Sequence, residues 1–67
     1  MYSVETERET DGRWIAEVVD LPGVLAYGQT REEAVRLAQA LSLHVLADRL
    51  EHGEPVPEVE SVFSIVA

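Results

Sequence analysis

The chain has 67 residues and no cysteine, and its thirteen aspartates and glutamates outnumber its five arginines, for a formal net charge of −8 at pH 7. So short a chain makes one domain, residues 1–67, and buries only about 60% of its extended surface, so we expect a second copy or a partner to cover apolar side chains. The charge excludes direct binding of DNA or RNA, which requires cations that displace phosphate counterions. The missing cysteines exclude a disulfide framework and a thiolate site.

The first half of the chain predicts three antiparallel strands, at residues 2–9, 13–19 and 24–27. The first two strands alternate their side chains with the period of a half-buried strand. A turn at Gly12 joins them as a hairpin, because glycine readily takes the positive φ that such turns need. A D-L-P-G turn that ends at Gly23 then leads into the third strand.

One long helix is predicted over about residues 30–52. Thr30 is a good N-cap, and Glu33 lies three residues further on, so the two form a capping box that satisfies orphan N–H groups at the helix start. Gly53 suits the left-handed position just after a helix, and two prolines follow it. A final strand is predicted at residues 60–66, which are rich in β-branched and aromatic side chains.

The apolar residues of the helix form two stripes at helical spacing. The stripe assigned to the core comprises Ala34, Leu37, Ala38, Leu41 and Val45. The second stripe comprises Val35, Leu43, Leu46, Ala47 and Leu50. Either the end of the chain wraps around the second stripe, or the stripe forms a contact between subunits. We favour the subunit contact, because so short a chain has little left to wrap with.

The order β-β-β-α-β predicts an α+β fold: a three-stranded antiparallel meander, a fourth strand added to the sheet, and one long helix packed on one face. The other face of the sheet still carries Ile15 and Val19, although an uncovered face is normally polar. This face is therefore expected to meet another chain. The expected partner or oligomer interface comprises Ile15, Val19, Leu43, Leu46 and Leu50.

Candidate catalytic residues are few. His44, Asp48 and His52 are spaced i, i+4, i+8 on the helix and could hold a metal, but a solvated polar edge explains them better. The glutamates of the first hairpin could mimic a two-metal nuclease, yet alternating glutamates on a strand are typical of its wet face. We therefore expect no catalytic residue, no metal and no cofactor, and a protein that is not an enzyme.

The negative charge favours a basic protein partner through long-range attraction, although an acidic surface also serves plain solubility. No basic segment leads into an apolar run, and no apolar run approaches the length of a membrane span. A soluble, cytoplasmic protein that forms a dimer or tetramer is the expectation from composition.

The stretch that spans residues 11–34 reads D-G-R-W-I-A-E-V-V-D-L-P-G-V-L-A-Y-G-Q-T-R-E-E-A, and it resembles the core signature of the HicB-type antitoxins. In that family a D-G turn, a strand ending near an acidic residue, a D-L-P-G turn and G-x-T-x-x-E-A follow one another in this order. The matching structural positions are Gly12, Pro22, Gly23, Gly28, Thr30 and Glu33.

The resemblance implies a degraded ribonuclease-H-like fold without hydrolytic activity. It also implies a role in a type II toxin–antitoxin system, in which the chain binds and sterically blocks a small basic ribonuclease toxin of the HicA type. Family members commonly carry a carboxy-terminal DNA-binding module, and these residues contain none, so autoregulation of an operon is not expected of this chain. The alternative is an orphan domain that only self-assembles or binds some other protein.

Overall fold

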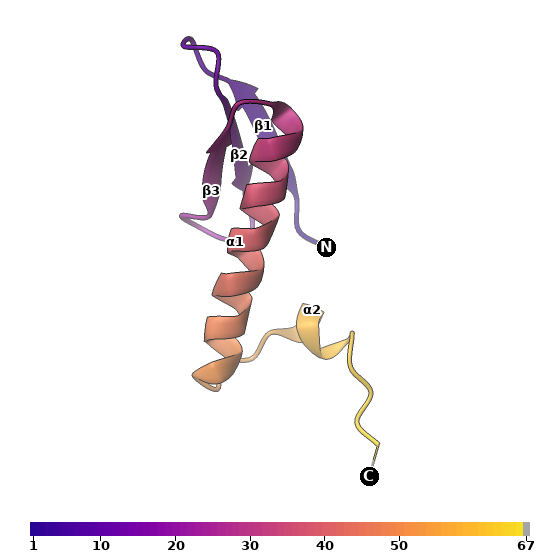
Figure 1. The fold of residues 1–67 in the computed structure, drawn as a ribbon. Helices are drawn as coiled ribbons and strands as arrows, with labels where there is room; N and C mark the ends of the chain where they lie inside the picture. Colours follow the sequence, from indigo (N-terminus) through magenta and orange to yellow (C-terminus); the bar gives the residue numbers. More distant parts are fainter. Residues whose placement is uncertain (67) are drawn as a thin grey trace.

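In the computed structural model, which describes residues 1–66, a long helix lies against one face of a three-stranded antiparallel sheet (Figure 1). The sheet has the order β1-β2-β3, and the elements are β1 (Val4–Arg8), β2 (Trp14–Val18), β3 (Leu25–Gly28), α1 (Arg31–Glu51) and α2 (Pro57–Glu60). The α+β class, the three-stranded meander and the single long helix are therefore confirmed.

Two glycine turns join the strands. Gly12, between β1 and β2, has φ of +93°, and Gly23, between β2 and β3, has φ of +84°. Side chains disfavour this left-handed region, so glycine lets both turns form without strain. The second turn also positions Leu21, whose backbone N–H donates to the carbonyl of Val18 at 3.0 Å. Leu21 thereby enters the core, where it is among the most deeply buried side chains.

The predicted N-cap is confirmed. The hydroxyl of Thr30 accepts a hydrogen bond from the backbone N–H of Glu33 at 3.0 Å. The carboxylate of Glu33 reaches back and accepts from the N–H of Gln29 at 2.8 Å, one residue earlier than in the standard capping box. Both bonds fix the direction in which the chain leaves β3 and enters α1.

The helix ends at Glu51, two residues before the predicted glycine. Gly53 has φ of +78°. Its N–H donates to the carbonyl of Leu50 at 3.1 Å, while the N–H of Glu54 donates to the carbonyl of Arg49 at 2.9 Å. This pair of bonds is a Schellman motif, which satisfies carbonyls that the helix leaves without partners.

The core lies between the sheet and the buried stripe of α1, which runs from Ala34 to Leu46, and Val56 closes its lower end. Its buried apolar members are Ala16, Val18, Leu21, Val24, Ala34, Ala38, Leu46 and Val56. Gly28 lets the helix start close to the sheet: a Cβ at this position would lie 2.5 Å from the backbone nitrogen of Ala34. Small residues therefore set the spacing between the two layers.

The predicted core stripe of the helix is partly wrong. Leu37 and Leu41 remain 44% and 37% exposed, whereas Leu46, expected at a subunit contact, is only 5% exposed. The buried stripe is turned about the helix axis and runs through Ala38 and Ser42 to Leu46. Ser42 is accommodated because its hydroxyl donates to the carbonyl of Ala38 at 2.8 Å. Small side chains of α1 face the sheet, and the larger Leu37 and Leu41 lie beside this buried stripe.

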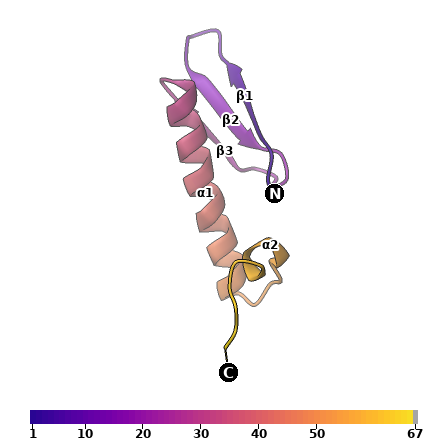
Figure 2. The ribbon, with the colours of Figure 1, turned by 90° about the vertical axis from the view of Figure 1, so that its right-hand side faces the viewer.

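The expected fourth strand is not formed within the described residues. Residues 57–60 instead make the short helix α2, which begins at Pro57, a residue suited to the first helical position. The turn continues because Ser61 donates its N–H to the carbonyl of Pro57 at 3.1 Å, and Phe63 donates to Glu60 at 3.3 Å. Residues 61–66 then lead away from the sheet, with no strand beside them to pair with (Figures 1 and 2).

Candidate binding surfaces

The face of the sheet opposite α1 is uncovered, as Figure 2 shows. Strand side chains alternate between the two faces, so each strand contributes residues of one parity to this open face. The open face comprises Glu5 and Glu7 from β1, Ile15 and Glu17 from β2, and Leu25 and Tyr27 from β3. All of these side chains are exposed except Ile15, which is partly buried.

Acidic and apolar residues occupy different halves of the open face. Glu5 lies directly opposite Glu17 in the β1–β2 pairing. Ile15 lies opposite Tyr27, and Glu17 opposite Leu25, in the β2–β3 pairing. Like charges directly opposite each other destabilise a sheet, so this pair of carboxylates works against folding. The β1 side of the face is thus acidic, and the β3 side is apolar.

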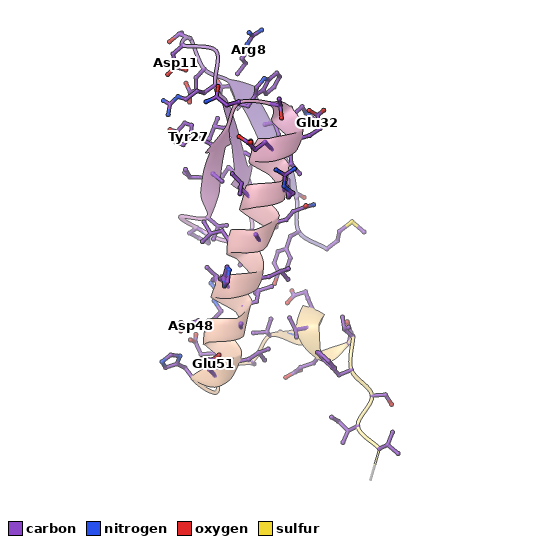
Figure 3. The ribbon with its side chains drawn as sticks, viewed as in Figure 1. Arg8, Asp11, Tyr27, Glu32, Asp48 and Glu51 are labelled. Carbon is purple, nitrogen blue, oxygen red and sulfur yellow. The ribbon has the colours of Figure 1, made fainter. Side chains whose placement is uncertain are left out.

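The aromatic ring at the apolar edge is held by the hairpin turn. The guanidinium carbon of Arg13 lies 4.5 Å from the centroid of the Tyr27 ring, a cation–π distance. Asp11 holds the arginine, because its carboxylate accepts from the Arg13 Nε at 2.8 Å and from the Arg13 backbone N–H at 3.1 Å. The backbone hydrogen bond is the main reason that the pKa of Asp11 lies below its ordinary value. Asp11 and Tyr27 occupy the same end of the sheet in Figure 3.

The five interface residues predicted from the sequence do not form one surface. Ile15 lies on the open face, and Val19 is exposed just beyond the end of β2. Leu43 and Leu50 are exposed on α1, on the other side of the sheet, and Leu46 is part of the core. Leu25 and Tyr27 belong to the open face but were not identified from the sequence, although alternation along the third strand predicts their shared side.

A second surface is an apolar groove between β1 and α1. The groove has a volume of about 380 Å³ and is lined by Tyr2, Val4, Val18, Gln39, Ser42, Leu43 and Leu46. It exists because α1 lies mainly over β2 and β3 and contacts β1 least. The side chain of Leu43 is 66% exposed at its rim. No lining residue is charged.

The lower end of this groove is joined to α2 by one hydrogen bond. The hydroxyl of Tyr2 donates to the carboxylate of Glu58 at 3.1 Å. Partial loss of hydration, followed by this bond and the negative charge of Glu58, raises the pKa of Tyr2 above its ordinary value. The bond and the buried Val56 together hold the start of α2 beside the first residues of the chain.

We expect α2 to loosen at high pH. The pKa of Tyr2 is raised in the folded state, so its stabilising bond is fully present below the ordinary value of 10.0 and is lost as pH rises through the folded value. Near-ultraviolet phenolate absorbance in a Tyr27→Phe background follows Tyr2 alone. Adding Glu58→Gln removes the neighbouring charge and should lower the Tyr2 midpoint. An unchanged midpoint would show that Tyr2 and Glu58 do not interact.

Residues 1–66 contain no group of three or more histidine, cysteine, aspartate or glutamate side chains that could hold a metal ion. Asp48 and His52 do approach each other, with 3.4 Å between the carboxylate Oδ1 and the imidazole Nδ1, but both side chains are largely exposed. Among the described helices, none has the length and apolar character needed to cross a bilayer.

Comparison of the chain with models of protein families, with curated proteins and with solved structures gives no match.

Proposed function

We propose that this chain is a non-catalytic, antitoxin-like protein of a type II toxin–antitoxin system, which binds a small basic ribonuclease of the HicA type and blocks it sterically. The observation that carries the proposal is the open face, where carboxylates lie beside apolar side chains on a chain of net charge −8. The HicB-like order of motifs in residues 11–34 supports the same role.

Each half of the open face has a physical task in such binding. Glu5, Glu7 and Glu17 present negative charge that attracts lysines and arginines of a basic partner and speeds the encounter. Ile15 and Tyr27 supply apolar area that leaves water when the partner docks, which slows its release. Carboxylates that oppose each other at a cost to the sheet gain favourable partners when cations cover them.

The signature residues support this surface and do not touch the partner. Gly12, Pro22 and Gly23 shape the turns at the two ends of β2, and Gly28 sets the distance to the helix. Thr30 and Glu33 begin α1, which stiffens the sheet from behind. Catalysis is not part of the proposed role, and the cytoplasm is its proposed location, because that is where a ribonuclease toxin meets messenger RNA.

Affinity capture from the lysate of the source organism tests the proposal. Three baits are compared at low and high salt: the natural chain, an open-face variant with Glu5→Lys and Glu17→Lys, and a control with Asp48→Lys and Glu51→Lys. Both variants change the net charge equally, but Asp48 and Glu51 lie at the far end of α1 (Figure 3). A small basic protein should be retained by the natural chain and the control and released by salt.

The open-face variant should retain none of it. Retention by the open-face variant, or equal loss from the control, would remove the open face from the proposal. A column that retains no basic protein, while the bait itself forms a stable oligomer, would favour the orphan, self-assembling alternative. That alternative is supported by one further observation, the exposed apolar end of the chain.

A further inference from the structure

Residues 61–66 form an apolar tail that pairs with no strand among the described residues and only borders an open hollow beside Leu50 and Val59. The side chains of Val62, Phe63, Ile65 and Val66 are between 67% and 91% exposed. The two remaining residues are serines, so the tail carries no charge. So much exposed apolar surface in a short segment is typical of a site that another chain covers.

The tail has the composition and alternation of a strand. It is rich in β-branched and aromatic residues. In an extended conformation Phe63 and Ile65 would lie on one side, and Val62, Ser64 and Val66 on the other. The side with Phe63 and Ile65 has the size and polarity to fill an apolar groove. The side with Val62, Ser64 and Val66 is smaller and suits a shallower surface.

A site of that kind lies along β1. This strand is at an edge of the sheet, and among the described residues no strand pairs with its outer side. The groove of about 380 Å³ runs beside it, between Val4 and Leu43, and exposes the flank of the core. An added strand would continue the sheet through backbone hydrogen bonds and place alternate side chains in the groove. Edge strands left open in this way readily pair with another chain.

We infer that residues 61–66 pair with β1 of a second copy of this chain, and that the two copies exchange their tails reciprocally. Phe63 and Ile65 enter the partner's groove, while Val62 and Val66 extend its open face. A reciprocal exchange closes after two copies and buries both tails and both grooves at once. It also supplies a fourth strand, which the described residues of one copy do not form.

The second copy is a better site for the tail than the edge of the same chain. Val56 is buried and Glu58 is bound to Tyr2, so the start of α2 is fixed at the lower end of the sheet. From there the hydrogen bonds of Ser61 and Phe63 direct the tail away from β1 (Figures 1 and 2). Pairing within one chain would require the tail to reverse its direction beside its own β1. Exchange with a second copy keeps Val56 and Glu58 in place and opens only the turn of residues 61–63.

Charge separates this surface from the proposed partner surface. Neither the tail nor the groove carries a charged residue, so a basic protein gains nothing electrostatic there. Two copies of net charge −8 repel each other, and the repulsion is screened by salt. Salt should therefore strengthen the exchange, whereas it should weaken binding of a basic partner. The inference does not depend on the antitoxin role.

Cross-linking tests the exchange directly, because the chain has no cysteine of its own. Glu5→Cys and Ser64→Cys are introduced together, so that thiols lie on β1 and on the same side of the tail strand. A short bis-maleimide should give a covalent dimer as the main product. An internally linked monomer would show pairing within one chain, a ladder of larger species would show open head-to-tail association, and no product would show no pairing. Each of these three results would overturn the inference.

The single-thiol variants are the controls and should give no covalent dimer; equal cross-linking by either would also refute the exchange. Sedimentation equilibrium supplies an independent readout. Phe63→Ser with Ile65→Ser should weaken dimerisation about 100-fold, because two large apolar side chains lose their site. Val62→Ser with Val66→Ser, on the other side of the same segment, should have a clearly smaller effect. The reverse order, or equal dimerisation by all variants, would contradict the assigned orientation.

Discussion

Replacement of Gly28 by alanine is expected to remove a large fraction of the free energy of unfolding. The added Cβ would lie 2.5 Å from the backbone nitrogen of Ala34 and 3.0 Å from its Cα. Backbone atoms cannot rotate away as a side chain can, so the first turn of α1 must move off the sheet. Overpacking of this kind costs about 1–3 kcal/mol and occasionally more. A core in so short a chain supplies only about 3–5 kcal/mol, so the loss is a large fraction of the total.

Urea unfolding followed by far-ultraviolet circular dichroism measures this effect. The matched control is Gly12→Asn, because a Cβ at Gly12 would have no neighbour within 4 Å and asparagine tolerates the left-handed region. The control should cost only about 1 kcal/mol, which is the strain of a side chain at φ of +93° without any clash. Similar losses for the two variants would mean that the close approach of the helix at Gly28 does not limit stability.

The second large effect is expected from leucine-to-alanine replacements at two positions of α1. Leu46 is 5% exposed and Leu37 is 44% exposed. Leu46→Ala should cost about 2–5 kcal/mol, because it removes apolar contacts and leaves a cavity. Leu37→Ala should cost less than about 1 kcal/mol, since much of its side chain is already in water. The change in helix propensity is the same in both variants, so the difference reports burial.

Both variants are unfolded at equal chain concentration, so that any association affects them alike. A larger loss of stability for Leu37→Ala than for Leu46→Ala would support the core stripe expected from the sequence. Equal losses of stability for the two variants would mean that the sheet does not bury the Leu46 side of the helix more than the Leu37 side. The expected order therefore tests the rotation of α1 directly.

Local signals in the sequence predicted most of the elements. Gly12 and Gly23 marked turns, and Thr30 and Gly53 marked the helix ends, because each satisfies a requirement of its own few neighbours. The rotation of α1 depends on the opposite layer. Apolar residues surround much of this helix, so periodicity allowed several faces. The preference for the face with Ala38 and Ser42 comes from the close approach to the sheet, which no helical pattern contains.

The structure of residues 60–66 also depends on contacts that the local sequence does not contain. Residues 60–66 have strong β propensity, but a strand needs an edge to pair with. Within one chain Pro57 starts a helical turn, and the tail reaches no edge. Of the open face, alternation identified Ile15, and it also identified Val19 just beyond the end of β2. The groove beside β1 could not be predicted, because it depends on how far α1 is displaced toward β3.

Inhibition of RNA cleavage tests the central claim most directly. The small basic protein captured by the natural chain is purified and incubated with RNA, alone and with increasing amounts of the chain. We predict cleavage by the basic protein alone and complete inhibition near equimolar chain. The variant with Glu5→Lys and Glu17→Lys should not inhibit, and the variant with Asp48→Lys and Glu51→Lys should inhibit fully. A captured protein that does not cleave RNA, or that cleaves equally with the natural chain present, would contradict the antitoxin role.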